Sequence, residues 1–351
     1  MIRRTAFWGL APVAAAAFAL ATAAPAGACG ALVAANGTIQ LTRTSTLAAY
    51  HDGVERYVTS FEFAGVGQSV GSIVPLPGIP TKVQRGGDWT LQRLEREVAP
   101  PEHALFAEDK AVANAGAQVI LHTTIDALNI DILKGGGDEV GKWATDHGYL
   151  LPPDAPTVLD FYGSRSKIFM AARFDVSRAQ QLGQNSGDGT PIMLTIPTKA
   201  PWVPLRILSL GLDKSRVVDA DVFLLTDNKP KLLAGGPGLS IQRDESASPQ
   251  LLDDLRSDKG MGWVPDHMWF RYLRLDVPAG QLDYDLAVSD GPGQLPSLRA
   301  VGVDAQQVRA VEPPPAPFTW WPVGIGVGIG AVTFAALGFS RRRFAAVRAT
   351  S

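Results

Sequence analysis

Short runs of β-branched and aromatic residues, many of them alternating with polar ones, recur along the middle of the chain and are separated by turn-forming residues. Such runs are typical of strands. In the run that contains Trp269 and Arg271, polar side chains interleave with apolar ones, which predicts a strand with one buried face. The predicted strands cover residues 54–63, 118–125, 167–176, 217–226 and 268–277.

Helical patterns are fewer. They predict helices over residues 90–98, 138–147 and 250–257, the last beginning after Ser248 as N-cap with Pro249 at the first helical position. The sequence therefore predicts a β-rich α+β domain in which antiparallel sheets, or a sandwich of sheets, carry a few helices.

The N-terminus has the three parts of a secretory signal peptide. Arg3 and Arg4 precede an apolar run over residues 6–24, and the small residues 26–28 follow. We expect a signal peptide over residues 1–28 that is removed from the mature protein. An uncleaved membrane anchor is the alternative, although the run ends in proline and small residues.

The C-terminus predicts a single transmembrane helix over residues 320–340. A stretch of this length spans about 30 Å as a helix, which is the hydrocarbon thickness of a bilayer. Trp320 and Trp321 suit the outer interface, and the basic tail, residues 341–351, would stay in the cytoplasm. A proline-rich linker over residues 312–319 precedes the helix. A buried core helix is the alternative reading.

Residues 29–311 would then form an extracytoplasmic domain. A polar loop near residues 183–191 either separates two sub-domains or joins two sheets. Outside residues 1–28 and 313–351 the chain carries 26 Lys and Arg against 34 Asp and Glu, a net charge of −8. An acidic domain gives no reason to expect nucleic acid as a partner. The single cysteine, Cys29, excludes an intramolecular disulfide and would be lipidated, free or paired between chains.

Four short motifs, taken in order, resemble those of DUF2330, a family of exported bacterial proteins of unknown function. The motifs are ACG at 28–30, VPLP at 74–77, WATDHGYLLP at 143–152 and WVPLRI at 202–207. The resemblance spans most of residues 28–300. It implies an exported, often membrane-tethered protein, and it implies no activity or site residue.

The patterns that carry chemistry are weak. The G-x-S-x-G around Ser69 precedes a proline-broken strand rather than a helix, and the S-x-x-K from Ser164 to Lys167 lacks its partner motif. The glycines at 135–137 precede a helix but lack the lysine of a phosphate-binding loop. Asp266 and His267 form the best candidate pair for a metal site. The spacing of the five histidines is not that of a metal-binding motif: they are His51, His103, His122, His147 and His267.

These observations predict no catalytic, cofactor-binding or metal-binding residue, and no cofactor. We expect a membrane-anchored, extracytoplasmic protein with a non-catalytic binding or structural role in the cell envelope. Its partners would be membrane lipid, through the C-terminal helix, and an envelope protein or polymer. The alternative is a cell-envelope hydrolase whose site is assembled from residues far apart in the sequence.

Overall fold

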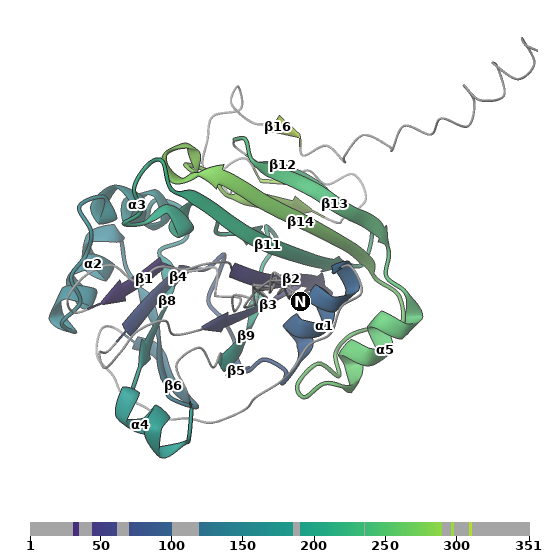
Figure 1. The fold of residues 1–351 in the computed structure, drawn as a ribbon, viewed down its shortest axis with the longest axis horizontal. Helices are drawn as coiled ribbons and strands as arrows, with labels where there is room; N and C mark the ends of the chain where they lie inside the picture. Colours follow the sequence, from purple (N-terminus) through teal and green to yellow (C-terminus); the bar gives the residue numbers. More distant parts are fainter. Residues whose placement is uncertain are drawn as a thin grey trace, which may run out of the picture. The chain divides into compact units, whose positions relative to one another are not determined.

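The structure is a computed structural model that describes residues 31–34, 44–61, 70–99, 119–184, 190–234, 236–289, 296–297 and 309–310 (Figure 1). Strands predominate, most of them pair antiparallel, and the helices are few and short. The predicted β-rich α+β fold class is therefore confirmed. The longest helix among the described residues has 10 residues, and no helix of this part is long and apolar enough to cross a membrane. The predicted signal peptide, linker and transmembrane helix lie outside these residues.

A seven-stranded sheet is the largest element of the fold. Its strand order is β13-β14-β11-β2-β3-β9-β5, and only β2 and β11 run parallel to each other. The strands are β2 (Thr44–His51), β3 (Val54–Phe61), β5 (Lys82–Arg85), β9 (Thr190–Pro197), β11 (Val217–Thr226), β13 (Leu239–Ser246) and β14 (Trp269–Pro278).

Two smaller sheets complete the strands. The five-stranded sheet has the order β1-β4-β8-β7-β6, and the four-stranded sheet has the order β10-β15-β12-β16. The first contains β1 (Ala31–Ala34), β4 (Val70–Pro75), β6 (Val119–Ile125), β7 (Leu128–Lys134) and β8 (Ile168–Phe174). The second contains β10 (Trp202–Val203), β12 (Lys231–Ala234), β15 (Leu286–Ser289) and β16 (Arg309–Ala310).

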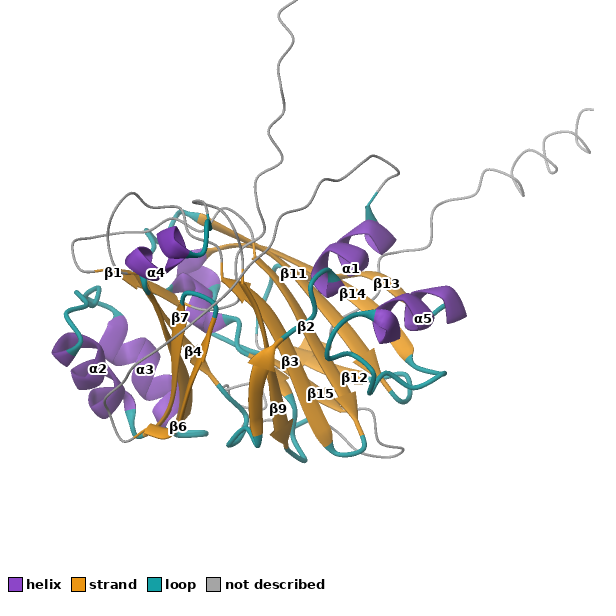
Figure 2. Ribbon diagram, turned by 90° about the horizontal axis from the view of Figure 1, so that it is seen from below, coloured by secondary structure: helices purple, strands orange, loops and turns teal. Residues whose placement is uncertain are grey.

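The helices are α1 (Thr90–Val98), α2 (Gly137–Asp146), α3 (Ala155–Gly163), α4 (Val176–Gln181) and α5 (Pro249–Ser257), with the 3-10 helices η1 (Arg206–Ser209) and η2 (Ala279–Gln281). Helices α2 and α3 pack on the five-stranded sheet, and α1 and α5 pack on the seven-stranded sheet (Figure 2).

Three apolar clusters define the layers. The central cluster joins the seven-stranded sheet to the inner faces of both smaller sheets: Leu224, Ile130 and Leu286, one residue from each sheet, all belong to it. A second cluster packs α2 and α3 against the five-stranded sheet, and a third packs α1 and α5 against the seven-stranded sheet. The sheets are thus covered on both faces, and the helices provide the outer layers.

The local signals of the helices act as the sequence predicts. The Ser248 side chain accepts a hydrogen bond from Leu251 N at the start of α5. Gly148, just after α2, has a φ of +81°, a conformation that costs glycine little. The strand β14 differs from expectation because both of its faces are buried: Leu273 lies in the central cluster and Phe270 in the third.

Strands from both sides of residues 185–189 pair within the seven-stranded sheet. β9 follows this segment and lies between β3 and β5, which precede it. Residues 185–189 themselves lie outside the described part of the chain. All the described residues fall within one compact unit, residues 1–312.

Candidate functional site

The β2–β3 hairpin has an exposed turn at Asp52 and Gly53, and it carries His51 and Glu55 on opposite faces. Asp52 and Gly53 both have positive φ, 52° and 74°, which is the backbone of the tight turns that favour Asp-Gly. The register of the hairpin pairs His51 with Val54 and puts Glu55, opposite Tyr50, on the other face. His51 and Glu55 therefore point to opposite sides of the hairpin.

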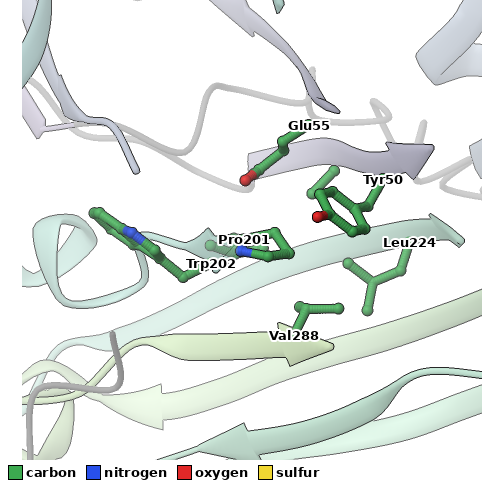
Figure 3. Close-up of a pocket in the computed structure, with 8 residues that line it drawn as sticks. Tyr50, Glu55, Pro201, Trp202, Leu224 and Val288 are labelled. Carbon is green, nitrogen blue, oxygen red and sulfur yellow. The ribbon is translucent and has the colours of Figure 1, made fainter. Parts of the chain in front are cut away.

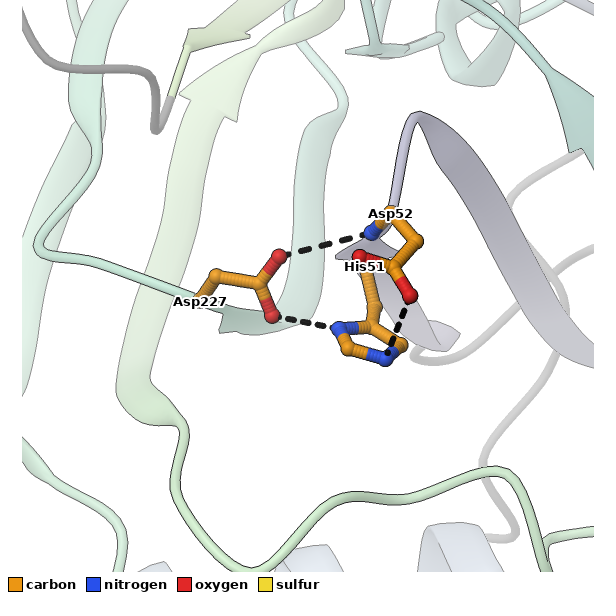
Figure 4. A group of neighbouring side chains, drawn as sticks. All are labelled: His51, Asp52 and Asp227. Carbon is orange, nitrogen blue, oxygen red and sulfur yellow. Dashed lines mark hydrogen bonds and ion pairs between the residues drawn. The ribbon is translucent and has the colours of Figure 1, made fainter.

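His51 and Asp52 meet Asp227, which follows the end of β11 (Figure 4). His51 Nδ1 lies 2.6 Å from Asp227 Oδ1, and its Nε2 lies 3.3 Å from Asp52 Oδ2. The backbone N–H of Asp52 donates to Asp227 Oδ2 over 3.4 Å. The three side chains are 24%, 84% and 33% exposed for His51, Asp52 and Asp227. The parallel pairing of β2 with β11 brings these distant residues together.

This group has the donor set of a divalent-metal site. One ligand atom from each of the three residues lies within 4.8 Å of the others. The part of the chain that the structure describes contains no other such group. Imidazole nitrogen with carboxylate oxygen suits transition metals. Arg56 lies close by, over the ring of Trp263 at 4.4 Å. Burial lowers the pKa of Arg56, and the charges of Asp52 and Asp227 oppose that shift.

On the other face of the hairpin, Glu55 points into a small cavity beside Pro201 and Trp202 (Figure 3). The cavity has room for about one water molecule. Neither carboxylate oxygen of Glu55 makes a hydrogen bond within the described residues, although the Trp202 backbone lies close to the carboxylate. Burial raises the pKa of Glu55 to about 8, and the Trp202 backbone opposes this rise. Glu55 is therefore protonated and neutral at pH 7.

A second buried carboxyl, Asp285, holds the other end of the same chain segment. Its Oδ1 accepts hydrogen bonds from Tyr162 Oη at 2.8 Å, Leu205 N at 2.8 Å and Arg206 N at 3.0 Å. Its Oδ2 has no hydrogen-bond partner within the described part of the chain. Burial raises the pKa of Asp285 to about 7, although these donors lower it. Residues 201–206 thus run between two buried carboxyls, Glu55 and Asp285.

The other histidines of the described residues have different surroundings. His122 Nδ1 lies 2.6 Å from Asp131 Oδ1. His147 Nδ1 lies 2.7 Å from the Trp143 carbonyl oxygen, and its ring stacks on that indole. His267 is exposed, and its neighbour Asp266 pairs with Arg256 at 2.8 Å. The structure does not bring Asp266 and His267 into a metal-binding group.

The remaining motifs of the sequence do not form sites in the described residues. At the start of α2 the Glu139 carboxylate accepts from Gly136 N over 2.6 Å, so the chain itself occupies the place where an anion would bind. Ser164 ends α3 and donates to the Phe161 carbonyl, whereas exposed Lys167 precedes β8 with a φ of 54°. Ser69, His103 and Cys29 lie outside the described residues.

Sequence reasoning missed the partners that define these sites. Nothing near Asp227 in the sequence points to His51, which is 176 residues away. The Asp-Gly turn at 52–53 was the available signal, because it predicts a hairpin that exposes His51. Glu55 and Asp285 carried a weaker signal. Glu55 lies inside the predicted strand over 54–63, whereas Asp285, two residues after Asp283, lies outside every predicted element.

The comparisons with known proteins give a family and no activity. They place the chain in a class of uncharacterized proteins that is conserved in bacteria. Residues 23–228 match DUF2330, described as an uncharacterized protein conserved in bacteria, and the chain belongs to this family. No curated protein matches it.

Solved structures of one viral protein resemble the chain at low similarity. The crystal structure of baculovirus P35 is 10% identical, covers 72% of this chain and 97% of its own, and has a TM-score of 0.36. A mutated baculovirus P35 after caspase cleavage is 7% identical, with 73% and 100% covered and a TM-score of 0.36. The caspase-8/P35 complex is 9% identical, with 73% and 98% covered and a TM-score of 0.33. A likeness this low says nothing about what the chain binds.

Proposed function

We infer that this member of DUF2330 is a membrane-anchored, extracytoplasmic domain that binds a ligand rather than transforming one. The location rests on the sequence of its two ends, with a leader-like segment over residues 1–28 and an apolar stretch over 320–340 followed by arginines. No observation on the described residues favours the alternative of an envelope hydrolase.

The observation that carries the binding role is the exposed group of His51, Asp52 and Asp227. Its ligand atoms lie within 4.8 Å of one another on an exposed turn, so a solute can reach them without any change in the fold. A divalent cation is the simplest ligand for this donor set.

A divalent-cation titration tests the binding site. Zn²⁺ or Mn²⁺ added to the purified full chain should raise its melting temperature in a saturable way, because an ion that binds only the folded state stabilises it. His51→Gln should abolish the rise. His267→Gln, which removes an exposed histidine elsewhere, is the matched control and should leave the rise unchanged. A rise that persists in His51→Gln, or no rise in the unaltered chain, would refute the site.

Thiol labelling tests the location. In a Cys29→Ser background, Lys142→Cys places a thiol at an exposed position of α2, and Ser351→Cys places one in the basic tail. A membrane-impermeant maleimide should label the first in intact cells and the second only after lysis. Labelling of the tail alone in intact cells would reverse the proposed orientation, and labelling of neither would place the domain inside.

A further inference from the structure

A group of polar side chains occupies one face of the five-stranded sheet. Directly opposed residues and alternate residues of antiparallel strands share a face. The register pairs His122 with Asp131, Thr124 with Asn129, and Asn129 with Arg173. These five residues therefore form one continuous polar face across β6, β7 and β8. The other face of the same strands is apolar, with Ile130, Ile132 and Ala172 in the central cluster.

Two interactions fix the centre of this polar face. Asp131 is fully buried, and its two oxygens face different partners. Oδ1 lies 2.6 Å from His122 Nδ1, and Oδ2 accepts from Arg173 Nη2 over 3.2 Å. The charges of Asp131 and Arg173 offset each other, so the polar face has little net charge when His122 is neutral.

The helix α2 adds an aromatic side chain to the face. The Arg173 guanidinium lies 5.9 Å from the centre of the Trp143 ring. The His147 ring stacks on the Trp143 ring, with the two ring centres 4.1 Å apart. Trp143 and His147 belong to the 143–152 motif. The His51 group does not involve this motif.

Five buried polar atoms of this face have no hydrogen-bond partner among the described residues. Buried polar groups in folded proteins are nearly always bonded, so a cluster of such atoms points to a ligand. Two of the side chains are more than nine-tenths buried: Asn129 is 7% exposed and Trp143 is 4% exposed. The atoms are His122 Nε2, Thr124 Oγ1, Asn129 Oδ1, Trp143 Nε1 and Arg173 Nε.

The face is reached from solvent at its edge. The side chains of His122 and Arg173 are 23% and 17% exposed, and β6 is the outermost strand of the sheet. The five atoms are themselves covered, so a ligand would enter beside His122 and the covering side chains would have to open before it contacts Asn129 and Trp143.

The five atoms select the chemistry of the ligand. Arg173 Nε and Trp143 Nε1 can only donate a hydrogen bond. With Nδ1–H directed at Asp131, His122 Nε2 accepts, as does Asn129 Oδ1, and the Thr124 hydroxyl does both. An anion could satisfy only the donors and would meet the Asp131 carboxylate, and a cation would meet Arg173. A hydroxyl group donates and accepts at once.

We propose that the β6–β8 polar face, together with Trp143, binds a neutral polyhydroxyl ligand, either a free sugar or a sugar unit of a glycan. The proposal rests on the proposed function, because it names the class of ligand for an extracytoplasmic binding domain at a second site. It does not involve His51, so either site can fail without the other.

The test follows the indole N–H of Trp143 by NMR. The full chain is labelled with ¹⁵N-tryptophan in a detergent that has no sugar head group, and the Trp143 signal is assigned by its loss in Trp143→Phe. The probes are glucose, N-acetylglucosamine, its β-1,4-linked tetramer, and acetate and inorganic phosphate. At least one sugar should shift the signal in a saturable way. Binding of single sugars indicates a free sugar, and binding of the tetramer alone indicates a glycan.

Two threonines on adjacent positions of β6 provide matched variants. Thr124→Val removes a hydroxyl from the polar face at nearly constant volume and should weaken sugar binding roughly 2- to 10-fold, the effect of one hydrogen bond. Thr123→Val makes the same change on the opposite face, since Thr123 pairs with Ile130, and should leave the affinity unchanged.

Three results would overturn the proposal. They are a Trp143 signal that no sugar shifts, equal affinities in Thr124→Val and Thr123→Val, and a signal that acetate or phosphate shifts while sugars do not. Each of these concerns the ligand alone. Failure of the proposed function would appear in the thiol labelling and cation titration instead, whatever the sugars do.

Discussion

At the scale of single residues, the most unusual groups are the buried carboxyls Glu55 and Asp285. Both sit against residues 201–206, and each has at least one oxygen that no described residue hydrogen-bonds. Burial of an ionised carboxylate is costly, so both groups bind protons more tightly in the folded chain than in the unfolded one. The pKa of Glu55 is raised to about 8 and that of Asp285 to about 7. These two residues make the free energy of unfolding depend on pH in the neutral range.

The sign of this dependence leads to a prediction for Glu55→Gln. As pH rises above the ordinary pKa of 4.5, the unfolded chain loses the Glu55 proton while the folded chain keeps it until about 8. The unfolded state then binds fewer protons, so Glu55 lowers stability progressively over this range, by up to about 5 kcal/mol. Glutamine cannot ionise. Glu55→Gln should therefore gain stability relative to the unaltered chain at pH 8 but not at pH 4.5.

Urea unfolding at pH 4.5, 6 and 8 measures the difference. Asp285 is unchanged in this variant, so a smaller decline in stability should remain up to about pH 7 and disappear in the double variant with Asp285→Asn. If Glu55→Gln shifted stability equally at all three pH values, the Glu55 carboxyl would titrate normally in the folded chain.

At the scale of elements, α2 and α3 approach each other through glycine. A Cβ built on Gly137 would lie 2.5 Å from Asp160 N and 2.8 Å from Leu159 C, both backbone atoms of α3. One turn further along α2, a Cβ on Gly141 would make only ordinary contacts of 3.5 and 3.8 Å with leucine methyl groups. The same substitution at these two glycines should therefore have opposite effects.

We expect Gly137→Ala to destabilise the chain by about 1–3 kcal/mol, because the helices must separate to admit the methyl group. Gly141→Ala should stabilise it by about 0.5–1 kcal/mol, because alanine loses less backbone entropy than glycine in a helix. Chemical denaturation of both variants in parallel measures the effects. A destabilising Gly141→Ala with a neutral Gly137→Ala would mean that α2 and α3 do not meet at these glycines.

The elements also show how far sequence reasoning reaches. The predicted strand over 217–226 and the helix over 90–98 coincide with β11 and α1, because their patterns and end signals are local. The helix α3 was missed: it begins Ala155-Pro156, and its largely apolar sequence shows little of the alternation of polar and apolar faces that marks a surface helix.

At the scale of the whole domain, the layers were beyond sequence reasoning. The single buried face predicted for the 268–277 strand was wrong, because the strand packs on both faces: Leu273 lies in the central cluster, and Phe270 lies in the cluster that includes α5. Arg271, read as a solvent-facing residue, is 4% exposed and pairs with Asp244 at 2.6 Å. The cation and polar sites depend on pairings across strands, so neither the His51–Asp227 contact nor the polar face of β6–β8 could be foreseen from spacing.

The parallel pairing of β2 with β11 has a consequence for how the chain folds. β2 pairs with β3 within a tight hairpin, but its other edge must wait for β11, which ends at Thr226. Pairing Tyr50 with Thr226 closes a very long loop of the chain, which costs entropy and slows this step. A strand edge that stays open until then can pair with another chain. The slowest and most aggregation-prone step of folding should therefore be the closure of the seven-stranded sheet at its centre.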